Sequence, residues 1–580
     1  MSGRARGAPA PGQAPLVAPN AAALLRRNAK EHGDQVAIRF GDGIWTHAQY
    51  YEESCRFAAL FEKYLPATGP RHVAVLLDNT PEYLFAFGGA ALIGAGIVGC
   101  NHTRRGEHLL RDIEHTHCSL VLTEPRHEQL LAPIAASLPT VLTSTRFVDN
   151  DDPPRVLGES LAEALDGVEA VDAGMEPDVD SIWALIFTSG TSDAPKAVIC
   201  SQRRLLVTGN RMRMIMDLDE SDTGYVCMPL FHSNAVQVGW APSLVTPCAV
   251  SLGRRFSASK WLSDVRRYQA TYFNYTGKPL AYLLSQPEAG DDSENTLQVA
   301  FGNEGSPEIV EAFARRFGVE VIDAYGATEG GVAVNRDAEA RAGALGHAPD
   351  HVQVVDEDGV EKARAQVDER GRVLNAEECV GEIVNTQGAG PFEGYYNNPE
   401  ATARTTRNGW YWSGDLGYKD ADGYLYFAGR NADWIRVDGE NFPAGPIEET
   451  LRHAPGVVLA SVYGVPDEQA GDQVMAGLVL ADGVEFDPEL FTKWLEAQAD
   501  IGPKWRPRYV RIMHDPPTTG TNKIVKRTLA QQKFRHDATG DDPLFVRERR
   551  AESYRPFTAA DEHTLHAAFV RAGRERFWDL

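Results

Sequence analysis

The sequence predicts an α/β protein in which a large N-terminal domain is followed by a small α+β domain. The chain has 580 residues and 43% hydrophobic composition, which exceeds what one ordinary core accommodates. Short β-branched runs, beginning with HVAVLL (His72 to Leu77) and CSLVLT (Cys118 to Thr123), alternate with longer amphipathic stretches. This alternation is typical of βα units with mostly parallel sheets. We therefore expect two βα subdomains in the large domain.

The pattern changes between Ala342 and Ala428. Short alternating runs such as CVGEIVNT and GYLYFAG are separated by turns such as Asp422-Gly423, which predicts antiparallel strands in a β-rich subdomain. After Arg430 the chain continues with VVLASVYGVPD, QVMAGLVLADG, a helical stretch at Pro488 to Ala497, and YVRIMHD. These runs predict the small α+β domain.

Two N-terminal segments bear on membrane contact and targeting. Residues 1–18 are rich in Pro, Ala and Gly and lack an apolar block of signal-peptide length, so we expect a disordered tail. The uncharged apolar run from Tyr83 to Cys100 is at the lower limit for a membrane span. Its five glycines and its position after a predicted strand favour a buried helix that leads into a second strand.

Charge and cysteine content limit the classes of function. The 57 basic and 81 acidic residues give a formal charge of -24, which opposes nonspecific binding to nucleic acid. Seven cysteines without a CxxC pair predict neither a disulfide framework nor a zinc site, and a cytoplasmic location is expected.

One C-terminal segment is basic, although the chain as a whole is acidic. Nine Lys or Arg residues and a single acidic residue, Asp515, lie between Ile501 and His536. We expect a positive face, which is either a solvated surface or a landing site for an anionic partner such as a phosphate or an anionic membrane.

The run FTSGTSDAPKAV, from Phe187 to Val198, predicts a loop that binds a polyphosphate. Short side chains let anionic oxygens reach the main chain, and hydroxyls and one ammonium add further contacts. A flexible surface turn is the alternative for such a composition. The candidate phosphate-binding residues are Thr188, Ser189, Gly190, Thr191, Ser192 and Lys196.

Further motifs follow in a fixed order along the chain. They are MPLFHSN (Met228 to Asn234), DAYGATEGG (Asp323 to Gly331), YWSGDLGYKDADGYLYFAGR (Tyr411 to Arg430), IRVDGENFPAGPIE (Ile435 to Glu448) and GTNKIVKRTL (Gly520 to Leu529). Together with the predicted phosphate loop, their order and spacing resemble the adenylate-forming superfamily, which includes acyl-CoA synthetases. The resemblance covers about residues 19 to 535.

Other segments resemble one branch of that superfamily. YFNYTGKPLAYLL (Tyr272 to Leu284), AFGNEGSPEIVEAFARRFG (Ala300 to Gly318) and Ala197 are similar to the fatty-acid transport protein and very-long-chain acyl-CoA synthetase branch.

The resemblance implies a domain organisation. We expect a tail at 1–18, an adenylation domain at 19–429, a mobile C-terminal domain at 430–536, and an extension at 537–580 that is helical in pattern. The boundary is expected at Gly429 to Asp433, where the family has its hinge.

The resemblance also implies a nucleotide site. Thr328 is expected to contact phosphate and Glu329 to hold Mg²⁺, a cation that takes oxygen ligands. Tyr325 offers a flat face to adenine, and Asp415 accepts hydrogen bonds from the ribose hydroxyls. The remaining residues implied in this site are Asp323, Gly326 and Arg430. A core position for Tyr325 and a turn-forming role for Asp415 are the alternatives.

Three further residues are implied in the chemistry. Lys523 is expected to bridge the acid's carboxylate and the α-phosphate, while the nearby Lys526 is expected on the surface. The backbone at Gly439 is expected beside the pantetheine tunnel after the small domain rotates. His232 is similar to a residue that gates the acyl pocket, although a packed core histidine is the alternative.

Two positions depart from the family pattern. Asp193 stands where most relatives have glycine, and a carboxylate there weakens polyphosphate binding unless it points outward. Ala432 stands where relatives carry a polar hinge residue.

The implied function is ATP-dependent acyl-CoA ligation. The acid is expected to be a medium to very long chain fatty acid or a steroid-like acid, with ATP, coenzyme A and Mg²⁺ required. Two alternatives stay open: an acyl-AMP ligase that transfers the acyl group to a carrier protein, and a homologue that binds nucleotide or acyl group without catalysis. Peripheral membrane contact and a homodimer also stay open.

Overall fold

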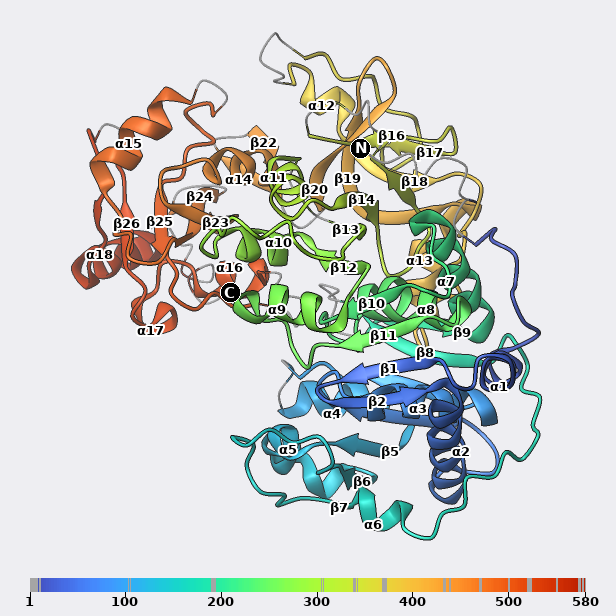
Figure 1. Cartoon of the computed structure of the whole chain (residues 1–580). Coiled ribbons are helices and arrows are strands. Elements are labelled where there is room, and N and C mark those ends of the chain that lie inside the picture. The colour runs from blue at the N-terminus through green and yellow to red at the C-terminus, as the bar shows by residue number, and fades with distance from the viewer. Residues whose placement is uncertain are drawn as a thin grey trace. The chain divides into compact units, whose positions relative to one another are not determined.

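The chain forms two compact units in the computed structural model (Figure 1). The first comprises residues 1–351 and 385–412, and the second comprises residues 352–384 and 413–580. The structure describes the chain except for residues 1–8, 10–11, 103, 105, 189–194, 304, 306, 337–340, 342, 368–372, 431–433, 438–439, 469–471, 499–500, 519–523, 549–550, 572–574, 576–577 and 579–580. The predicted domain boundaries stay predictions, because the expected hinge includes residues 431–433.

A seven-stranded sheet in the first unit has the order β7-β6-β5-β3-β4-β8-β9. All of its neighbours are parallel except β8 and β9, which are antiparallel at one edge. The strands are β3 (His72–Leu76), β4 (Gly96–Gly99), β5 (Cys118–Thr123), β6 (Thr140–Thr143), β7 (Glu159–Ser160), β8 (Ile182–Phe187) and β9 (Ala197–Ser201). The two strand runs predicted at His72 and Cys118 are confirmed.

An eight-stranded sheet in the same unit has the order β15-β14-β13-β12-β10-β11-β1-β2. Only its two outermost pairs are antiparallel. The strands are β1 (Val36–Phe40), β2 (Gly43–Thr46), β10 (Thr223–Val226), β11 (Ala249–Leu252), β12 (Tyr272–Thr276), β13 (Val299–Asn303), β14 (Glu320–Gly326) and β15 (Ala333–Asn335). Two sheets of mainly parallel strands agree with the predicted pair of βα subdomains.

Helices connect and cover these strands (Figure 1). They are α1 (Ala21–Glu31), α2 (His47–Tyr64), α3 (Pro81–Ile93), α4 (Gly106–His115), α5 (Pro125–Leu131), α6 (Leu161–Leu165), α7 (Gln202–Met216), α8 (Ala241–Val245), α9 (Ala258–Tyr268), α10 (Gly277–Leu284), α11 (Pro307–Phe317) and α13 (Pro399–Thr405). Short 3-10 turns lie at Ala132–Ser137 and Arg407–Gly409, a π-helical turn lies at Asn234–Trp240, and β16 is Ala344–His347.

The apolar run that begins at Tyr83 forms a buried helix, as predicted. Helix α3 begins with Pro81 in its first turn and ends at Gly94, whose φ of 65° is left-handed, and every residue between them is buried. Gly88 lets α2 approach closely, because a Cβ atom there would lie 2.0 Å from the Ser54 hydroxyl oxygen. The strand β4 follows directly. No helix in the described part of the chain is long and apolar enough to cross a membrane.

The second unit contains antiparallel strands and a separate five-stranded sheet. Strands β17 (Val352–Val355), β18 (Gly381–Asn385), β19 (Tyr411–Lys419) and β20 (Tyr424–Arg430) are neighbours in the order β20-β19-β18-β17. The other sheet has the order β23-β24-β25-β26-β27, from β23 (Val457–Pro466), β24 (Asp472–Leu480), β25 (Tyr509–Ile512), β26 (Leu544–Val546) and β27 (Arg555–Pro556). The antiparallel pairing of β19 with β20 confirms the pattern change after Ala342.

In the described part of the second unit, the remaining elements are a hairpin and six helices. The hairpin consists of β21 (Trp434–Val437) and β22 (Glu440–Pro443). The helices are α12 (Ala376–Cys379), α14 (Gly445–Leu451), α15 (Pro488–Ala497), α16 (Lys526–Gln532), α17 (His536–Thr539) and α18 (Ala559–Arg571). Helix α15 has the predicted bounds, because the Asp487 carboxylate accepts hydrogen bonds from two first-turn N–H groups and caps it.

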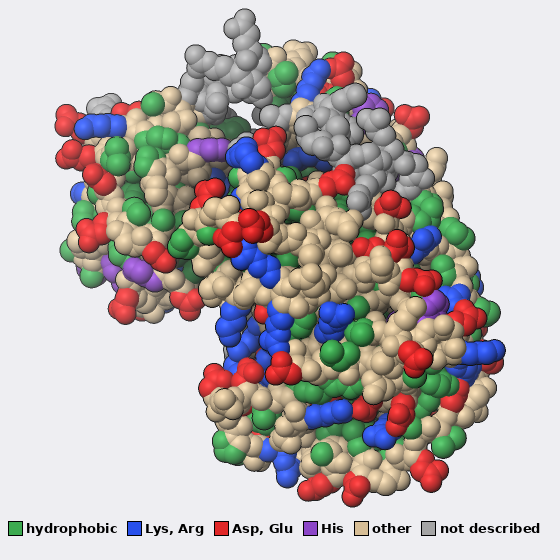
Figure 2. All heavy atoms as spheres, viewed as in Figure 1, with side chains coloured by type: hydrophobic (Ala, Val, Ile, Leu, Met, Phe, Trp, Pro, Cys, Tyr) green, Lys and Arg blue, Asp and Glu red, His purple; other side chains and the backbone are tan. Residues whose placement is uncertain are grey.

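Acidic partners neutralise much of the basic run between Ile501 and His536. Arg508 contacts Asp467 and Glu468, and Arg511 contacts Asp542 at 2.7 Å. Lys526 contacts Glu448 at 2.9 Å. Figure 2 shows both acidic and basic side chains on the visible face, with several basic side chains gathered near its centre. Partners distant in sequence thus balance the charge of these three residues, and a positive face formed by the rest of the run stays a prediction.

The C-terminal extension is part of the core of the second unit. Strand β26 pairs with β25, and β27 pairs with β26. Phe557, Phe569 and Trp578 are buried in one hydrophobic cluster with residues of β23, β24 and β25. The Lys533 ammonium donates a hydrogen bond to the Trp578 carbonyl at 2.8 Å. The extension therefore completes the unit instead of forming an appendage.

We predict that Phe569→Ala destabilises the second unit. The Phe569 side chain is fully buried, so its loss should cost about 3–5 kcal/mol of unfolding free energy. Val570→Ala is the control, because its neighbour Val570 is 48% exposed and its truncation should have little effect. Urea unfolding followed by fluorescence measures both. Equal stability of the two variants would contradict a structural role for the extension.

Candidate functional site

The ends of the predicted phosphate loop are fixed by the antiparallel pair of β8 and β9. Strand β8 is parallel to β4 on its other side, so it is anchored within the sheet. The Thr188 N–H donates a hydrogen bond to the Lys196 carbonyl at 3.0 Å, which closes the loop. Ser189, Gly190, Thr191, Ser192 and Asp193 lie outside the described residues. Thr188 and Lys196 thus fix where the loop starts and ends.

A second segment pairs with the outer side of β9. The Ile199 N–H donates to the Gly394 carbonyl at 3.0 Å, and the Tyr396 N–H donates to the Ala197 carbonyl at 2.8 Å. This pairing places Tyr395 beside the end of the loop. The Lys196 ammonium lies 5.5 Å from the centroid of the Tyr395 ring, within the range of a cation–π interaction.

Tyr395 also contacts the loop that follows β14 and carries Thr328 and Glu329, which we call the acidic loop. Its hydroxyl donates a hydrogen bond to Glu329 Oε1 at 2.7 Å. One buried tyrosine therefore contacts both a predicted phosphate-binding cation and the predicted Mg²⁺-binding carboxylate. Burial first, and the Glu329 charge second, raise the pKa of Tyr395, so its hydroxyl remains a donor at neutral pH.

Arg204 fixes the backbone of the same acidic loop. Its guanidinium donates hydrogen bonds to the carbonyls of Thr328 and Glu329, the latter at 3.0 Å, and to the Ile199 carbonyl at 2.6 Å. Arg204 lies in the first turn of α7, which the Ser201 side chain caps directly after β9. The acidic loop is thereby tied to the strand that ends the phosphate loop.

Thr328 also contacts the MPLFHSN motif. The Ser233 and Thr328 hydroxyls lie 2.8 Å apart. His232, next to Ser233, has a buried Nε2 atom for which no hydrogen-bond partner occurs among the described residues. Burial, with a smaller effect of His102, lowers the pKa of His232 to about 3. The structure thus brings together the described parts of three predicted motifs, with a neutral imidazole beside them.

The other predicted nucleotide residues on β14 differ in their surroundings. Asp323 is buried, and its Oδ2 atom accepts hydrogen bonds from the Tyr275 hydroxyl at 2.8 Å and the Gly305 N–H at 3.0 Å. These contacts hold the ends of neighbouring strands together. Tyr325 is half-buried and Gly326 is exposed. Their roles toward a nucleotide stay predictions.

The second unit carries the remaining predicted residues. Asp415 on β19 is buried and lies directly opposite Arg430 on β20 in the antiparallel ladder. Gly439, Lys523 and Ala432 lie outside the described residues. Lys526, which was predicted on the surface, is half-buried and forms an ion pair with Glu448, which also accepts a hydrogen bond from the Val462 N–H.

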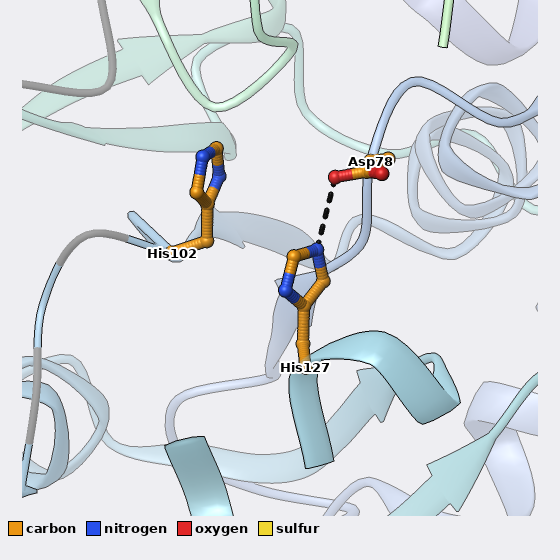
Figure 3. A group of neighbouring side chains, drawn as sticks. All are labelled: Asp78, His102 and His127. Atoms are coloured by element: carbon orange, nitrogen blue, oxygen red, sulfur yellow. Dashed lines mark hydrogen bonds and ion pairs between the residues drawn. The ribbon is translucent and has the colours of Figure 1, made fainter. Parts of the chain in front are cut away.

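One cluster of side chains is spaced closely enough to bind a metal ion; it consists of Asp78, His102 and His127 (Figure 3). They follow β3, β4 and β5, at the carboxyl ends of three adjacent parallel strands. His127 Nε2 lies 3.0 Å from Asp78 Oδ1, and the His102 ring stacks on His127. The Arg254 guanidinium lies 3.2 Å from Asp78 Oδ2 and also binds Glu124. The Arg254 guanidinium already balances the negative charge of Asp78 and Glu124, which disfavours binding of a metal ion here.

The charged groups of this cluster shift one another's pKa values. Burial opposes the charged form of His127, but hydrogen bonds to Asp78 and Glu124 outweigh it and raise the pKa to about 9. Burial likewise opposes ionisation of Asp78, but His127 and then Arg254 lower its pKa to about 2. His127 is therefore a buried cation, whereas His232 is a neutral imidazole whose Nε2 atom is buried.

We predict that the contribution of His127 to stability depends on pH. Its folded pKa exceeds the unfolded value of 6.5, so the protonated form stabilises the fold fully below pH 6.5 and loses this effect as pH rises through 9. His127→Gln should cost about 2 kcal/mol at pH 6 and clearly less at pH 9.5. Chemical denaturation of both proteins across this range measures the difference. A difference that does not vary with pH would contradict a charged His127.

Two residues of the site were not predicted from sequence. Arg204 follows the phosphate-loop strand in the run SQRR, and Tyr395 lies in the run GYYNNPE. Neither run shows which distant loop the side chain reaches. Basic and aromatic residues often lie near strands for structural reasons, so their presence in these two runs does not by itself indicate a functional site.

Comparison with known proteins identifies matching families and relatives. The AMP-binding enzyme family matches residues 25–396, and the AMP-binding enzyme C-terminal domain matches residues 446–523. Steroid-22-oyl-CoA synthetase from Rhodococcus jostii (strain RHA1) is 45% identical over 547 residues, which cover 94% of this chain and 96% of that protein. Medium/long-chain-fatty-acid--CoA ligase FadD17 from Mycobacterium tuberculosis (strain ATCC 25618 / H37Rv) is 43% identical and covers 86% of this chain and 94% of its own length.

Solved structures match the fold. The anthranilate CoA ligase AuaEII in complex with anthranoyl-AMP has a TM-score of 0.76 at 20% identity, and covers 90% of this chain and 98% of its own. ATP-bound MatB from Rhodopseudomonas palustris has a TM-score of 0.73 at 24% identity, and covers 88% and 98%. The α/β fold with a large N-terminal and a small C-terminal domain is therefore confirmed.

Proposed function

The chain belongs to the AMP-binding enzyme family, and we propose that it is an acyl-CoA ligase for a fatty or steroid-like carboxylic acid. The observation that carries this proposal is the convergence of Lys196, Glu329, Thr328 and His232 in one unit. Relatives that the chain matches along most of its length are CoA ligases for steroid and medium or long-chain fatty acids by name.

The first step joins the acid to AMP. A carboxylate oxygen of the acid attacks the α-phosphorus of ATP, the bond from this phosphorus to the β-phosphate oxygen breaks, and pyrophosphate leaves. Lys196 and the phosphate loop neutralise negative charge on the transferring and leaving groups. Thr328 and Glu329 offer hard oxygen donors that suit Mg²⁺, which would neutralise further phosphate charge when bound.

His232 suits this step because it stays neutral. A charged imidazole beside the acid would form an ion pair with the carboxylate and stabilise the ground state before attack. With its pKa lowered to about 3 by burial, His232 instead offers a neutral polar edge at physiological pH. The carboxylate then keeps its negative charge available for attack on phosphorus.

The second step transfers the acyl group to coenzyme A. The thiol sulfur attacks the carbonyl carbon of the acyl-adenylate, the carbon–oxygen bond to phosphate breaks, and AMP leaves with that oxygen. The small domain is proposed to supply Lys523 for the first step and the backbone at Gly439 for the second. Asp415 and Arg430 are proposed to bind the ribose. A cytoplasmic location, a homodimer and peripheral membrane contact stay predictions.

We predict that Lys523→Ala slows adenylate formation by about 100-fold or more, because one positioned cation at the reacting phosphorus is lost. Thioester formation from synthetic acyl-adenylate should remain within about threefold of the unmodified protein. Rapid-quench assays measure the two half-reactions separately. Lys526→Ala is the matched control, since this lysine is tied to Glu448. Equal damage to both half-reactions in Lys523→Ala would contradict the proposed role.

We predict that a panel of acids separates the substrate classes. Thioester formation should be detected with long aliphatic acids or with polycyclic acids that have a carboxylate on a side chain, and should be weak with short acids such as acetate. Mass spectrometry of the CoA thioesters measures the outcome. Release of pyrophosphate without any thioester would instead favour transfer to a carrier protein. No pyrophosphate release with any acid would favour a binding protein without catalysis.

A further inference from the structure

Tyr395 contacts two oppositely charged groups of the proposed nucleotide site. Its hydroxyl donates a hydrogen bond to Glu329 at 2.7 Å, and its ring face lies 5.5 Å from the Lys196 ammonium. Tyr395 is 6% exposed, whereas its partners Lys196 and Glu329 are half-buried, so both contacts are partly shielded from water. Because electrostatic interactions strengthen as water is excluded, Tyr395 affects the energies of both the Lys196 and the Glu329 charge.

The ring of Tyr395 is held rigidly. Its backbone forms a bridge with Val198 on β9, and its N–H donates to the Thr402 hydroxyl at 2.9 Å. The Phe392 ring packs edge-on against it, with centroids 4.9 Å apart. Since Lys196 directly precedes β9, one strand fixes both the ammonium and the phenol.

A cation and a carboxylate in one site attract each other before any ligand arrives. If Lys196 and Glu329 formed a direct ion pair, the triphosphate and its cation would have to break that pair before binding. The Tyr395 hydroxyl instead satisfies Glu329, and its ring face gives Lys196 a favourable position. Among the described residues, the Lys196 ammonium forms no ion pair. Both charges are thereby stabilised without neutralising each other.

We propose that Tyr395 is a positioning residue that keeps Lys196 and Glu329 apart, so that one receives phosphate oxygens and the other receives the accompanying divalent cation. This inference rests on the proposed function, because it needs a nucleotide with a bound cation as ligand. The sequence predicted separate roles for Lys196 and Glu329 and did not connect them, so this role of Tyr395 is additional.

The test is a double-mutant cycle of ATP binding at several Mg²⁺ concentrations. Isothermal titration calorimetry is applied to the unmodified protein, Tyr395→Phe, Glu329→Gln and the double variant. Tyr395→Phe keeps the ring but releases the Glu329 carboxylate to pair with Lys196. We expect it to weaken ATP binding in Mg²⁺ by about tenfold and to raise the Mg²⁺ concentration that half-saturates this binding.

The Glu329→Gln background distinguishes positioning from packing. Once the carboxylate charge is gone, no competing ion pair forms, so adding Tyr395→Phe should change ATP binding by less than about twofold. Tyr396→Phe is the matched control, because the Tyr396 hydroxyl bonds to His117 instead. Its Mg²⁺ and ATP dependence should equal that of the unmodified protein.

The outcomes separate this inference from the proposed function. If the unmodified protein and Tyr396→Phe bind ATP with Mg²⁺ but Tyr395→Phe binds equally well, the inference is overturned and the function stands. Equal losses from Tyr395→Phe in both backgrounds would show a packing role only and would also overturn it. Absence of ATP binding by the unmodified protein would overturn the proposed function itself.

Discussion

Strand β9 is the constraint on which the geometry of the candidate site depends. On one side it pairs with β8 and closes the predicted phosphate loop through the contact between Thr188 and Lys196. On its other side it pairs with the segment that carries Tyr395. Its C-terminal end leads into α7, which presents Arg204 to the acidic loop. A single five-residue edge strand therefore positions groups that are far apart in the sequence.

Buried charge in the first unit is set by its partners. His127 and His232 have the same side chain, and burial opposes protonation of both, yet their pKa values shift in opposite directions. His127 has two carboxylate partners and stays charged, whereas no such partner is found for His232 among the described residues. The charged cluster lies at the carboxyl ends of the sheet strands, while the neutral His232 is compatible with the proposed binding of a carboxylate nearby.

The sequence predicted the elements whose signals are local. Alternating runs predicted β3 and β5, and a proline and a capping aspartate mark the start of α15. Motifs predicted a phosphate loop and the Thr328–Glu329 loop, and the structure places the described ends of the first, Thr188 and Lys196, near the second through Tyr395. Arg204, Tyr395 and the ion pairs of the C-terminal basic run could not be predicted, since each depends on a partner that only the fold brings near. The helical pattern of α18 was visible, but the burial of its Phe569 depends on packing against Trp578, which no local pattern indicates.

The central claim is that the acid is activated by joining one of its own oxygens to the α-phosphorus of ATP. The most direct measurement uses an accepted acid labelled with ¹⁸O in both carboxylate oxygens, together with ATP and coenzyme A, followed by mass spectrometry of all products. The account predicts one ¹⁸O atom in AMP, one retained in the thioester, and none in pyrophosphate. Unlabelled AMP alongside labelled phosphate or pyrophosphate would contradict it.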